Sequence, residues 1–390
     1  MEFSSKDSGK EVEMILENDY TYESGRILGS MCTDSHPVAL ASFRKYHQKN
    51  LGDPALFPGA KIIEQKAIAI IAKLLNGDSK RVVGSFVAGG SEANITALWA
   101  ARNYARQEKM QKQPIILAPV TIHPSVDKAA DLLSLELIKI PVNSVYRMRT
   151  DILRKELAKN PVAVVAVAGT TALGAIDPIQ EIGSMCQASK TWLHIDAAFG
   201  GFTIPFLPPN AQEPFDFQVS AVNSITCDPH KMARVPIPAG VVLFRSHEMR
   251  SGIEHILPYL STASQQQYTL SGTRTAGTAI AFYQLWQAIG SKGFEENVRT
   301  CLENTHFLAK QLQKRGFHLP VKPKMNILGA YPPSHIDLKA LIAKLERKKW
   351  MVPAPNGHLR FVLMSHIRRS TLEAFLRDLD LILSENQAYE

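Results

Sequence analysis

The chain has 390 residues, a net charge of +8, 45% hydrophobic and 21% charged residues. This length exceeds one small core and fits one large domain with a smaller one. The four cysteines form no CxxC pair, which argues against a disulfide framework or a thiolate zinc site and favours a reducing cytoplasm. Residues 1–20 lack the apolar core of a signal peptide, and the longest apolar run is too short to span a bilayer, so we expect a soluble protein without a membrane segment.

Much of the positive charge lies late in the sequence, in Glu346–Lys349 and His366–Arg369. A solvated basic face explains these runs better than a nucleic-acid site, because no nucleic-acid motif accompanies them. A modest positive field also favours anionic cofactors and substrates. We therefore expect no nucleic-acid partner.

The first 60 residues read as irregular to helical, and residues 61–75 carry helical periodicity. From there to about residue 245, short apolar runs alternate with helical stretches. The runs predict seven strands, at 82–87, 114–120, 135–140, 162–168, 191–196, 221–227 and 240–244. Apolar strands separated by helices predict an α/β fold with a mostly parallel sheet covered on both faces. A loop without a helix joins the last two strands, so one of them is free to run antiparallel.

The last third of the sequence begins with a long helix over 285–312 that is interrupted near Gly290. A small α+β region follows, with strands expected at 326–330 and 359–364 and helices at 336–348 and 370–384. These features predict an N-terminal segment over 1–60, a large domain over 61–285 and a small C-terminal domain over 286–390.

Residues capable of chemistry follow five of the predicted strands. In doubly wound sheets, ligands bind beyond the carboxyl ends of the strands. The residues found there are Gly89 to Asn94 after the first strand, His123 after the second, Gly169-Thr170-Thr171 after the fourth, Asp196 at the end of the fifth and Lys231 after the sixth.

Gly89 and Gly90 allow close backbone approach, and Ser91 begins a helix. A helix N-terminus offers free N–H groups and a positive dipole end to a phosphate, although Ser91 is equally consistent with a simple helix cap. The run is neither GxGxxG nor a Walker A loop, so it carries no dinucleotide or ATP fingerprint.

Asp196 ends an alternating apolar strand and precedes two small residues, Ala197 and Ala198. A carboxylate at the floor of a pocket can pair with a protonated pyridine nitrogen, and the small residues leave room for a flat ring. The alternative is a metal pair with His194, which alternation brings to the same face of the strand. No further cluster completes a coordination sphere, so we expect no metal.

Lys231 ends the turn Asp228-Pro229-His230-Lys231. A lysine held rigidly there and partly desolvated has a lowered pKa and can form a Schiff base, although most such lysines are solvated. His123 can stack on an aromatic cofactor and move protons, although a lone histidine is usually structural. A phosphate cradle, a ring-nitrogen carboxylate, a stacking imidazole and a Schiff-base lysine together favour pyridoxal 5′-phosphate (PLP).

The order of these motifs resembles that of the group II PLP-dependent amino-acid decarboxylases, and in particular the archaeal L-tyrosine/L-aspartate decarboxylases. The motifs are Leu51 to Pro54, Gly89 to Asn94, Ala168 to Thr171, Gly174 to Asp177, His194 to Gly201, Asp228 to Lys231 and Ser271 to Arg274. The resemblance implies an aspartate aminotransferase-like fold of type I and a homodimer with shared active sites. It also implies that residues 1–60 pack on the dimer partner.

The resemblance further implies roles for individual residues. Lys231 would bind the cofactor covalently, Asp196 would contact the pyridine nitrogen and His123 would stack on the ring. Thr273, after Gly272, would reach the partner subunit's phosphate, unless this pair only starts a helix. Other implied cofactor contacts are Gly90, Ser91, Thr170, Ala198 and His230. A lysine or a tyrosine would return the proton, with Tyr259 and Tyr268 as the tyrosines in the corresponding segment. Arg360 is either an anchor for the substrate carboxylate or an ordinary surface arginine.

The activity that the resemblance implies is decarboxylation of L-tyrosine to tyramine, of L-aspartate to β-alanine, or of both. These products would serve methanofuran and coenzyme A biosynthesis in the cytoplasm. Decarboxylation of L-glutamate and PLP-dependent carbon–carbon lysis remain alternatives. A non-catalytic binding protein that keeps the fold is a third.

Overall fold

A computed structural model describes residues 5–108, 113–258 and 265–387. Its α-helices are α1 (Ser5–Leu16), α2 (Pro37–Tyr46), α3 (Pro58–Leu74), α4 (Gly90–Glu108), α5 (Ser125–Leu133), α6 (Thr150–Glu156), α7 (Ile179–Ser189), α8 (His247–Ser251), α9 (Gly277–Lys314), α10 (Leu338–Arg347) and α11 (Arg369–Gln387). Its strands are β1 (Val83–Val87), β2 (Ile115–Pro119), β3 (Glu136–Ile140), β4 (Ala163–Val167), β5 (Trp192–Asp196), β6 (Val222–Cys227), β7 (Gly240–Phe244), β8 (His255–Leu257), β9 (Gln265–Gln267), β10 (Ile327–Ala330) and β11 (Leu359–Val362).

Seven strands form the large sheet in the order β1-β7-β6-β5-β4-β2-β3. The pairs β2–β3, β2–β4, β4–β5 and β5–β6 are parallel. Strand β7 runs antiparallel to both of its neighbours, β1 and β6. The predicted α/β class, the seven strands and the single reversed strand are therefore confirmed.

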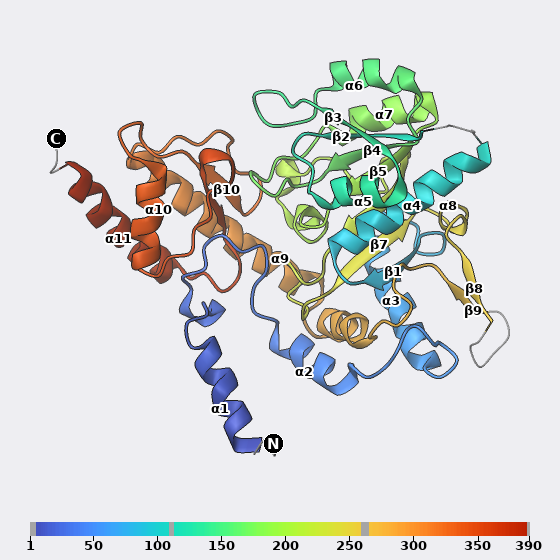
Figure 1. Cartoon of the computed structure of the whole chain (residues 1–390), viewed down its shortest axis with the longest axis horizontal. Helices are drawn as coiled ribbons and strands as arrows, with labels where there is room; N and C mark the ends of the chain where they lie inside the picture. Colours follow the sequence, from blue (N-terminus) through green and yellow to red (C-terminus); the bar gives the residue numbers. More distant parts are fainter. Residues whose placement is uncertain (1–4, 109–112, 259–264, 388–390) are drawn as a thin grey trace.

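Helices cover both faces of this sheet (Figure 1). Because side chains alternate along a strand, Val165 and Val167 of β4 pack with α4 and α5, whereas Val164 and Ala166 pack with α3, α7 and the first part of α9. Burial on both faces explains why these strands read as continuous apolar runs in the sequence.

A separate hydrophobic core lies at the C-terminal end of the chain, where α10, α11 and the β10–β11 ribbon pack on the second part of α9. Helix α9 links this core to the large sheet, and its backbone leaves helical geometry at Gly290, where φ is +58°. The predicted interruption at Gly290 is confirmed. The division into domains over 1–60, 61–285 and 286–390 stays a prediction.

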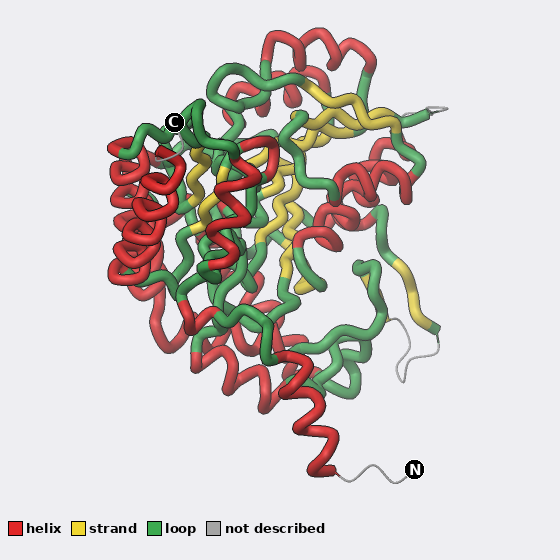
Figure 2. The backbone as a smooth tube through the Cα atoms, turned by 60° about the vertical axis from the view of Figure 1, so that its left-hand side comes forward, coloured by secondary structure: helices red, strands yellow, loops and turns green. Residues whose placement is uncertain are grey.

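Parts of the N-terminal segment pack on the chain's own cores. Leu28 is buried in the C-terminal core, and Ala39 of α2 is buried in the large core, where α2 packs on α9. Helix α1 differs, because it projects from the body in two views (Figures 1 and 2). Four apolar side chains of α1 are more than half exposed: Val12, Met14, Ile15 and Leu16.

Candidate active site

A cavity of about 340 Å³ opens at the carboxyl ends of the parallel strands. Its lining includes seven residues singled out from the sequence: Gly90, Ser91, His123, Asp196, Ala198, His230 and Lys231. Three others, Thr170, Thr273 and Arg360, lie outside the lining formed by the described residues. Gly169 and Thr171, which follow β4, also line the cavity. The topology thus brings residues from five strand ends to one place, as expected for a doubly wound sheet.

Lys231 forms a close ion pair at the cavity wall. Its Nζ lies 3.0 Å from Oδ2 of Asp228, whose side chain is 2% exposed. Burial acts to lower the pKa of Lys231, but the carboxylates of Asp228 and Asp196 outweigh it and raise that pKa above its ordinary value. The expected net lowering of the Lys231 pKa is therefore wrong for the chain without a cofactor. Desolvation does act in that direction, but two buried carboxylates stabilise the ammonium more strongly.

The carboxylate of Asp196 is oriented by two protein donors. Its Oδ1 accepts the backbone N–H of Ala198 at 3.1 Å, and its Oδ2 accepts Nδ2 of Asn94 at 3.0 Å. Each oxygen keeps acceptor capacity beyond these bonds, since a carboxylate oxygen has two lone pairs. Asp196 can therefore accept a further donor from a ligand in the cavity that it lines.

The turn between β1 and α4 brings backbone atoms to the cavity. Gly89 has φ of +92°, a conformation that favours glycine. At Gly90, a Cβ would lie 2.8 Å from Oδ2 of Asp228 and 3.2 Å from Cβ of Ala198, so only glycine fits without displacement. Helix α4 begins there and offers its first N–H groups beside Ser91, the arrangement that binds a phosphate.

His123 is exposed at the cavity mouth, and its Nδ1 lies 3.0 Å from Oγ of Ser125. His230 also lines the cavity, and its Nδ1 bonds the carbonyl of Ala239 at 2.6 Å. Burial lowers the pKa of His230 despite the carboxylate of Asp228. An exposed imidazole over the cavity leaves room for a flat ring beneath it.

Two residues with predicted contacts point elsewhere in the described structure. Thr170 is buried, and its hydroxyl accepts the N–H of Ala175 at 3.0 Å within its own turn, whereas the neighbouring Thr171 lines the cavity. Arg360 donates from Nη2 to the carbonyl of Gly29 at 2.6 Å. Their roles at the site stay predictions.

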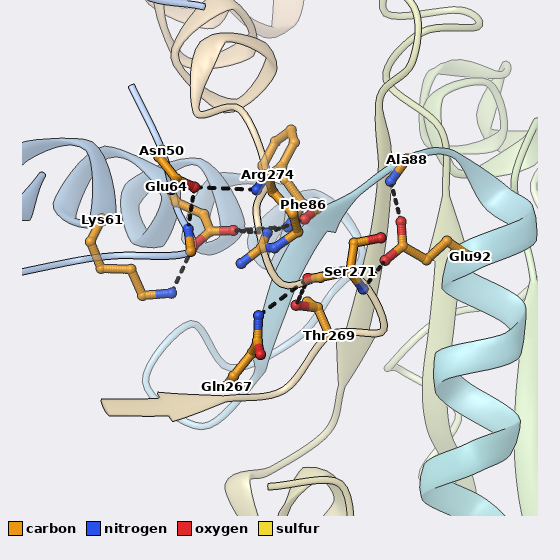
Figure 3. Close-up of polar contacts among 11 residues, drawn as sticks. Asn50, Lys61, Glu64, Phe86, Ala88, Glu92, Gln267, Thr269, Ser271 and Arg274 are labelled. Atoms are coloured by element: carbon orange, nitrogen blue, oxygen red, sulfur yellow. Dashed lines mark hydrogen bonds and ion pairs between the residues drawn. The ribbon is translucent and has the colours of Figure 1, made fainter. Parts of the chain in front are cut away.

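Thr273 is exposed, and its neighbours in the same loop, Ser271 and Arg274, are held by hydrogen bonds and an ion pair to other parts of the chain (Figure 3). Arg274 donates to the carbonyl of Phe86 and pairs with Glu64 at 3.2 Å. Glu92 of α4 accepts the N–H groups of Ser271 at 3.1 Å and Ala88 at 2.7 Å, so one carboxylate joins this loop to the turn that lines the cavity.

Of the two tyrosines considered as proton donors, Tyr259 lies outside the described residues. The Tyr268 hydroxyl bonds Glu254 at 3.0 Å and Gln266 at 2.9 Å, and Arg250 stacks 3.7 Å from the centre of its ring. Tyr268 lines a different cavity of the same chain. Its role stays a prediction.

The suspected metal pair has a different function. Both ring nitrogens of His194 have protein partners, Ser224 at 2.8 Å and Asn94 at 3.0 Å. Within the described ranges, no group of three histidine, cysteine or acidic side chains is arranged to hold a metal ion. Likewise, no helix among the described residues combines the length and hydropathy needed to cross a bilayer.

Asn94, Thr121 and Asp228 also line the cavity, but sequence reasoning gave them no role. Asp228 lies in the same motif as Lys231, and Asn94 lies in the same motif as Ser91. Membership of these motifs was the only signal in the sequence that could have identified them as cavity residues. Thr121 follows a predicted strand end directly, as His123 does, and this position could have identified it.

The lining fits PLP. Two buried polar atoms, Oδ1 of Asp228 and Oγ1 of Thr121, have no hydrogen-bond partner among the described residues. Buried polar atoms without partners indicate a missing ligand or water. The same cavity also holds a lysine, a carboxylate and the glycine turn at the start of α4. These groups and the two unpartnered atoms supply the donor and acceptor set that this cofactor requires.

Comparison with known proteins agrees with this interpretation. Residues 48–329 match the pyridoxal-dependent decarboxylase conserved domain. The "Probable L-tyrosine/L-aspartate decarboxylase" of Methanothermobacter thermautotrophicus is 41% identical over 364 residues, 92% of this chain and 98% of the relative. The "L-aspartate decarboxylase" of Thermococcus kodakarensis is 38% identical over 95% of each chain. The "L-aspartate/L-glutamate decarboxylase" of Pyrococcus horikoshii is 36% identical over 96% of this chain and 97% of the relative.

Solved structures support the fold. The sphingosine-1-phosphate lyase of Burkholderia pseudomallei has a TM-score of 0.90 at 21% identity and covers 100% of this chain and 92% of its own. The glutamate decarboxylase of Lactobacillus brevis also has a TM-score of 0.90, at 22% identity, and covers 99% of this chain and 93% of its own. The predicted fold type and cofactor are confirmed, and the chain belongs to the family of pyridoxal-dependent decarboxylases.

Proposed function

We propose that this decarboxylase acts on L-aspartate to give β-alanine, with L-tyrosine to tyramine as its second reaction. The observation that carries the proposal is one cavity that combines Lys231 with Asp196 in a chain whose relatives are named for these substrates. L-Glutamate is the next candidate, because one relative's name includes it. Formation of β-alanine and tyramine would serve coenzyme A and methanofuran biosynthesis in the cytoplasm.

Each cavity residue would have a distinct task. Lys231 would bind the cofactor covalently, Asp196 would accept the pyridinium N–H, and His123 would cover the ring. Gly90 and Ser91 would hold the phosphate at the start of α4, and Ala198 and His230 would complete the contacts from the lining. Thr170, which lies outside the lining formed by the described residues, would join them. When bound, PLP supplies an electron sink for the electrons released as carbon dioxide leaves. Asp228 would hold the proton of the Lys231 amine when the lysine is free.

Arg360 would anchor the carboxylate of the substrate. Its Nη2 already bonds the carbonyl of Gly29, two residues before Met31, which lines the cavity. Its Nε is buried without a hydrogen-bond partner among the described residues. Burial lowers the pKa of Arg360, which shows a desolvated guanidinium, and a desolvated guanidinium pairs strongly with a carboxylate.

The active unit would be a homodimer in which each subunit completes its partner's site. Thr273 supports this, because it is exposed on a fixed loop outside its own cavity. Helix α1 supports it as well, because its exposed apolar side chains have no cover from the described residues of the same chain. In this dimer, residues 1–60 would contribute α1 to the partner, and the Thr273 hydroxyl would reach the partner's phosphate.

The test is direct assay of the purified, PLP-loaded protein. L-Aspartate, L-tyrosine and L-glutamate are supplied separately, and the amine products are identified by mass spectrometry. We expect the highest kcat/KM with L-aspartate and no product from the Lys231→Ala variant, which should remain folded. An enzyme that forms none of the three amines, or a Lys231→Ala variant as active as the wild type, would refute the proposal.

A further inference from the structure

Asn94, which lines the cavity, is the centre of a buried polar cluster. Asn94 is 1% exposed and bonds one other residue of the cavity lining, Asp196. Nδ2 lies 3.0 Å from Oδ2 of Asp196 and 2.9 Å from Oγ of Ser125, and Oδ1 lies 3.0 Å from Nε2 of His194. An ionised carboxylate only accepts, so the side of the Asn94 amide that faces Asp196 must be its NH₂ group. Both hydrogens of that group are therefore used.

His194 holds the opposite side of the amide. Because Oδ1 of Asn94 only accepts, Nε2 of His194 must carry a proton, and Thr226 offers it a second, longer contact at 3.4 Å. Burial lowers the pKa of His194 to about 4, so the ring is neutral and its Nδ1 is an acceptor. The Ser224 hydroxyl donates to that nitrogen at 2.8 Å and accepts Nε1–H of Trp192 at 2.9 Å.

The cluster continues from Asn94 to the cavity mouth. The Ser125 oxygen accepts from Asn94, so its own proton is free to point to Nδ1 of His123 at 3.0 Å. The backbone N–H of Ser125 reaches the same nitrogen at 3.1 Å. Two donors converge on Nδ1 of His123, so the neutral ring carries its proton on Nε2. The hydrogen bonds that lead from Trp192 to His123 therefore all run the same way: each group donates to the next one toward His123.

We propose that Asn94 is a positioning residue that orients the Asp196 carboxylate toward the ring nitrogen of PLP and, through Ser125, fixes the tautomer of His123. The inference rests on the proposed role of Asp196. Asn94 joins the residue proposed to face the ring nitrogen to the residue proposed to cover the ring, and His194 prevents the amide from flipping. Without Asn94, one carboxylate oxygen loses a donor, and the carboxylate is free to turn away from the ring plane.

The test compares two ligands in the Asn94→Leu variant, whose side chain has a similar volume and no hydrogen bonds. Dissociation constants of the apoprotein are measured for PLP and for 1-deaza-PLP, in which a C–H group replaces the ring nitrogen. Only PLP can engage Asp196 through that nitrogen. We expect Asn94→Leu to reduce the preference for PLP over the analogue by about tenfold, the scale of a hydrogen bond to a charged group, with little change in analogue affinity.

Three controls accompany this measurement. Asp196→Ala removes the carboxylate and should abolish the preference. Ser125→Ala removes only the hydrogen bonds that lead from Asn94 to His123, and this variant should keep the preference for PLP. Asn304→Leu makes the same change at another buried asparagine, whose Nδ2 donates to the carbonyl of Ile367 at 2.9 Å, and should also keep it. Asn94→Ser, which is smaller and cannot span the same contacts, gives the same comparison if the leucine variant does not fold.

The outcomes separate the inference from the function on which it rests. If Asp196→Ala keeps the preference for PLP, the proposed role of Asp196 fails and the inference fails with it. If Asp196→Ala loses the preference and both Asn94 variants keep it, the inference alone is overturned. Equal weakening of both ligands in the Asn94 variants would make Asn94 a purely structural residue and would also overturn it.

Discussion

The pairing of Lys231 with Asp228 determines how readily the lysine amine reacts. The ammonium is stabilised by a carboxylate at 3.0 Å and by the more distant Asp196, and both act against the effect of burial. A protonated amine is not a nucleophile, so in the proposed role of Lys231 as the covalent cofactor lysine, capture of PLP by the apoprotein would require loss of this proton. The rate of capture should therefore rise with pH over the range in which Lys231 loses its proton.

Replacing Asp228 by asparagine should speed this capture. Asp228→Asn removes one of the two charges that raise the pKa of Lys231. The lowering effect of burial is then opposed by one carboxylate, that of Asp196, so the pKa falls. The neutral amine is then more abundant at pH 8, and the second-order rate of PLP binding should increase about tenfold for each unit by which the pKa falls. Stopped-flow absorbance of apoprotein mixed with PLP measures the rate.

The pH dependence provides the control for this prediction. At a pH above the pKa of Lys231 in both proteins, the wild type and Asp228→Asn should bind PLP at similar rates, because the Lys231 amine is neutral in each. A variant that binds more slowly than the wild type at pH 8 would mean that Asp228 assists the reaction in another way than by holding the ammonium.

At the scale of elements, an ion pair covers the backbone of the edge strand β1 (Figure 3). Strand β1 is an edge strand, and the outward N–H and C=O groups of Phe86 bond Glu64 and Arg274. Burial acts to raise the pKa of Glu64, but Lys61 and Arg274 lower it below its ordinary value. The charges thus satisfy each other and also two backbone groups of an edge strand, which would otherwise be open to pairing.

Breaking this pair should destabilise the fold strongly. Arg274→Met leaves the buried Glu64 carboxylate with Lys61 alone, and we expect a loss of about 3–5 kcal/mol in the free energy of unfolding. Apolar replacement of both charges is often neutral elsewhere. Here the double variant Glu64→Leu/Arg274→Met should remain at least about 2 kcal/mol less stable than the wild type, because Phe86 loses both backbone partners.

Urea unfolding of the apoproteins measures these differences. Arg315→Met is a matched control, since Arg315 pairs with Asp380 on the surface at 2.6 Å and should contribute less than about 1 kcal/mol. Full recovery of stability in the double variant would refute the proposed protection of the strand edge.

The whole molecule shows which features the sequence can predict. Strands such as 162–168 were recognisable because burial on both faces makes them apolar throughout, and the helix interruption was recognisable from Gly290. Strands β8 and β9 were missed because they are three residues each, too short for an alternating pattern, and β9 consists of three glutamines. At the site, position after a strand revealed Lys231 and Asp196.

The partners of the site residues were less accessible. Asn94 is 102 residues from Asp196 in the sequence, and its contact depends on how α4 packs beneath the carboxyl end of β5. The raised pKa of Lys231 also depends on tertiary contacts, because the sign of the shift follows from which buried charges surround the amine. Residue order identifies the groups, but only packing determines how each is oriented and charged.

The proposed sharing of sites between subunits predicts complementation in a mixed dimer. One chain carries Lys231→Ala, and the other carries Thr273→Glu, which brings a negative charge to the partner's phosphate. Each variant alone should form an inactive homodimer. In the mixed dimer, the intact Lys231 of one chain meets the intact Thr273 of the other, so one site of two is whole and activity should be about half that of the wild type.

Dimers purified through a different tag on each chain allow this measurement. A mixed dimer of Lys231→Ala with Asp196→Ala is the control. Both of these residues line the cavity of one chain, so the first site lacks its lysine, the second lacks its carboxylate, and little activity should return. If Thr273 instead acts within its own chain, the Lys231→Ala and Thr273→Glu pair should be as inactive as this control. The two mixed dimers should differ in activity only if the Thr273 loop reaches the partner's site, because complementation depends on which chain supplies each residue.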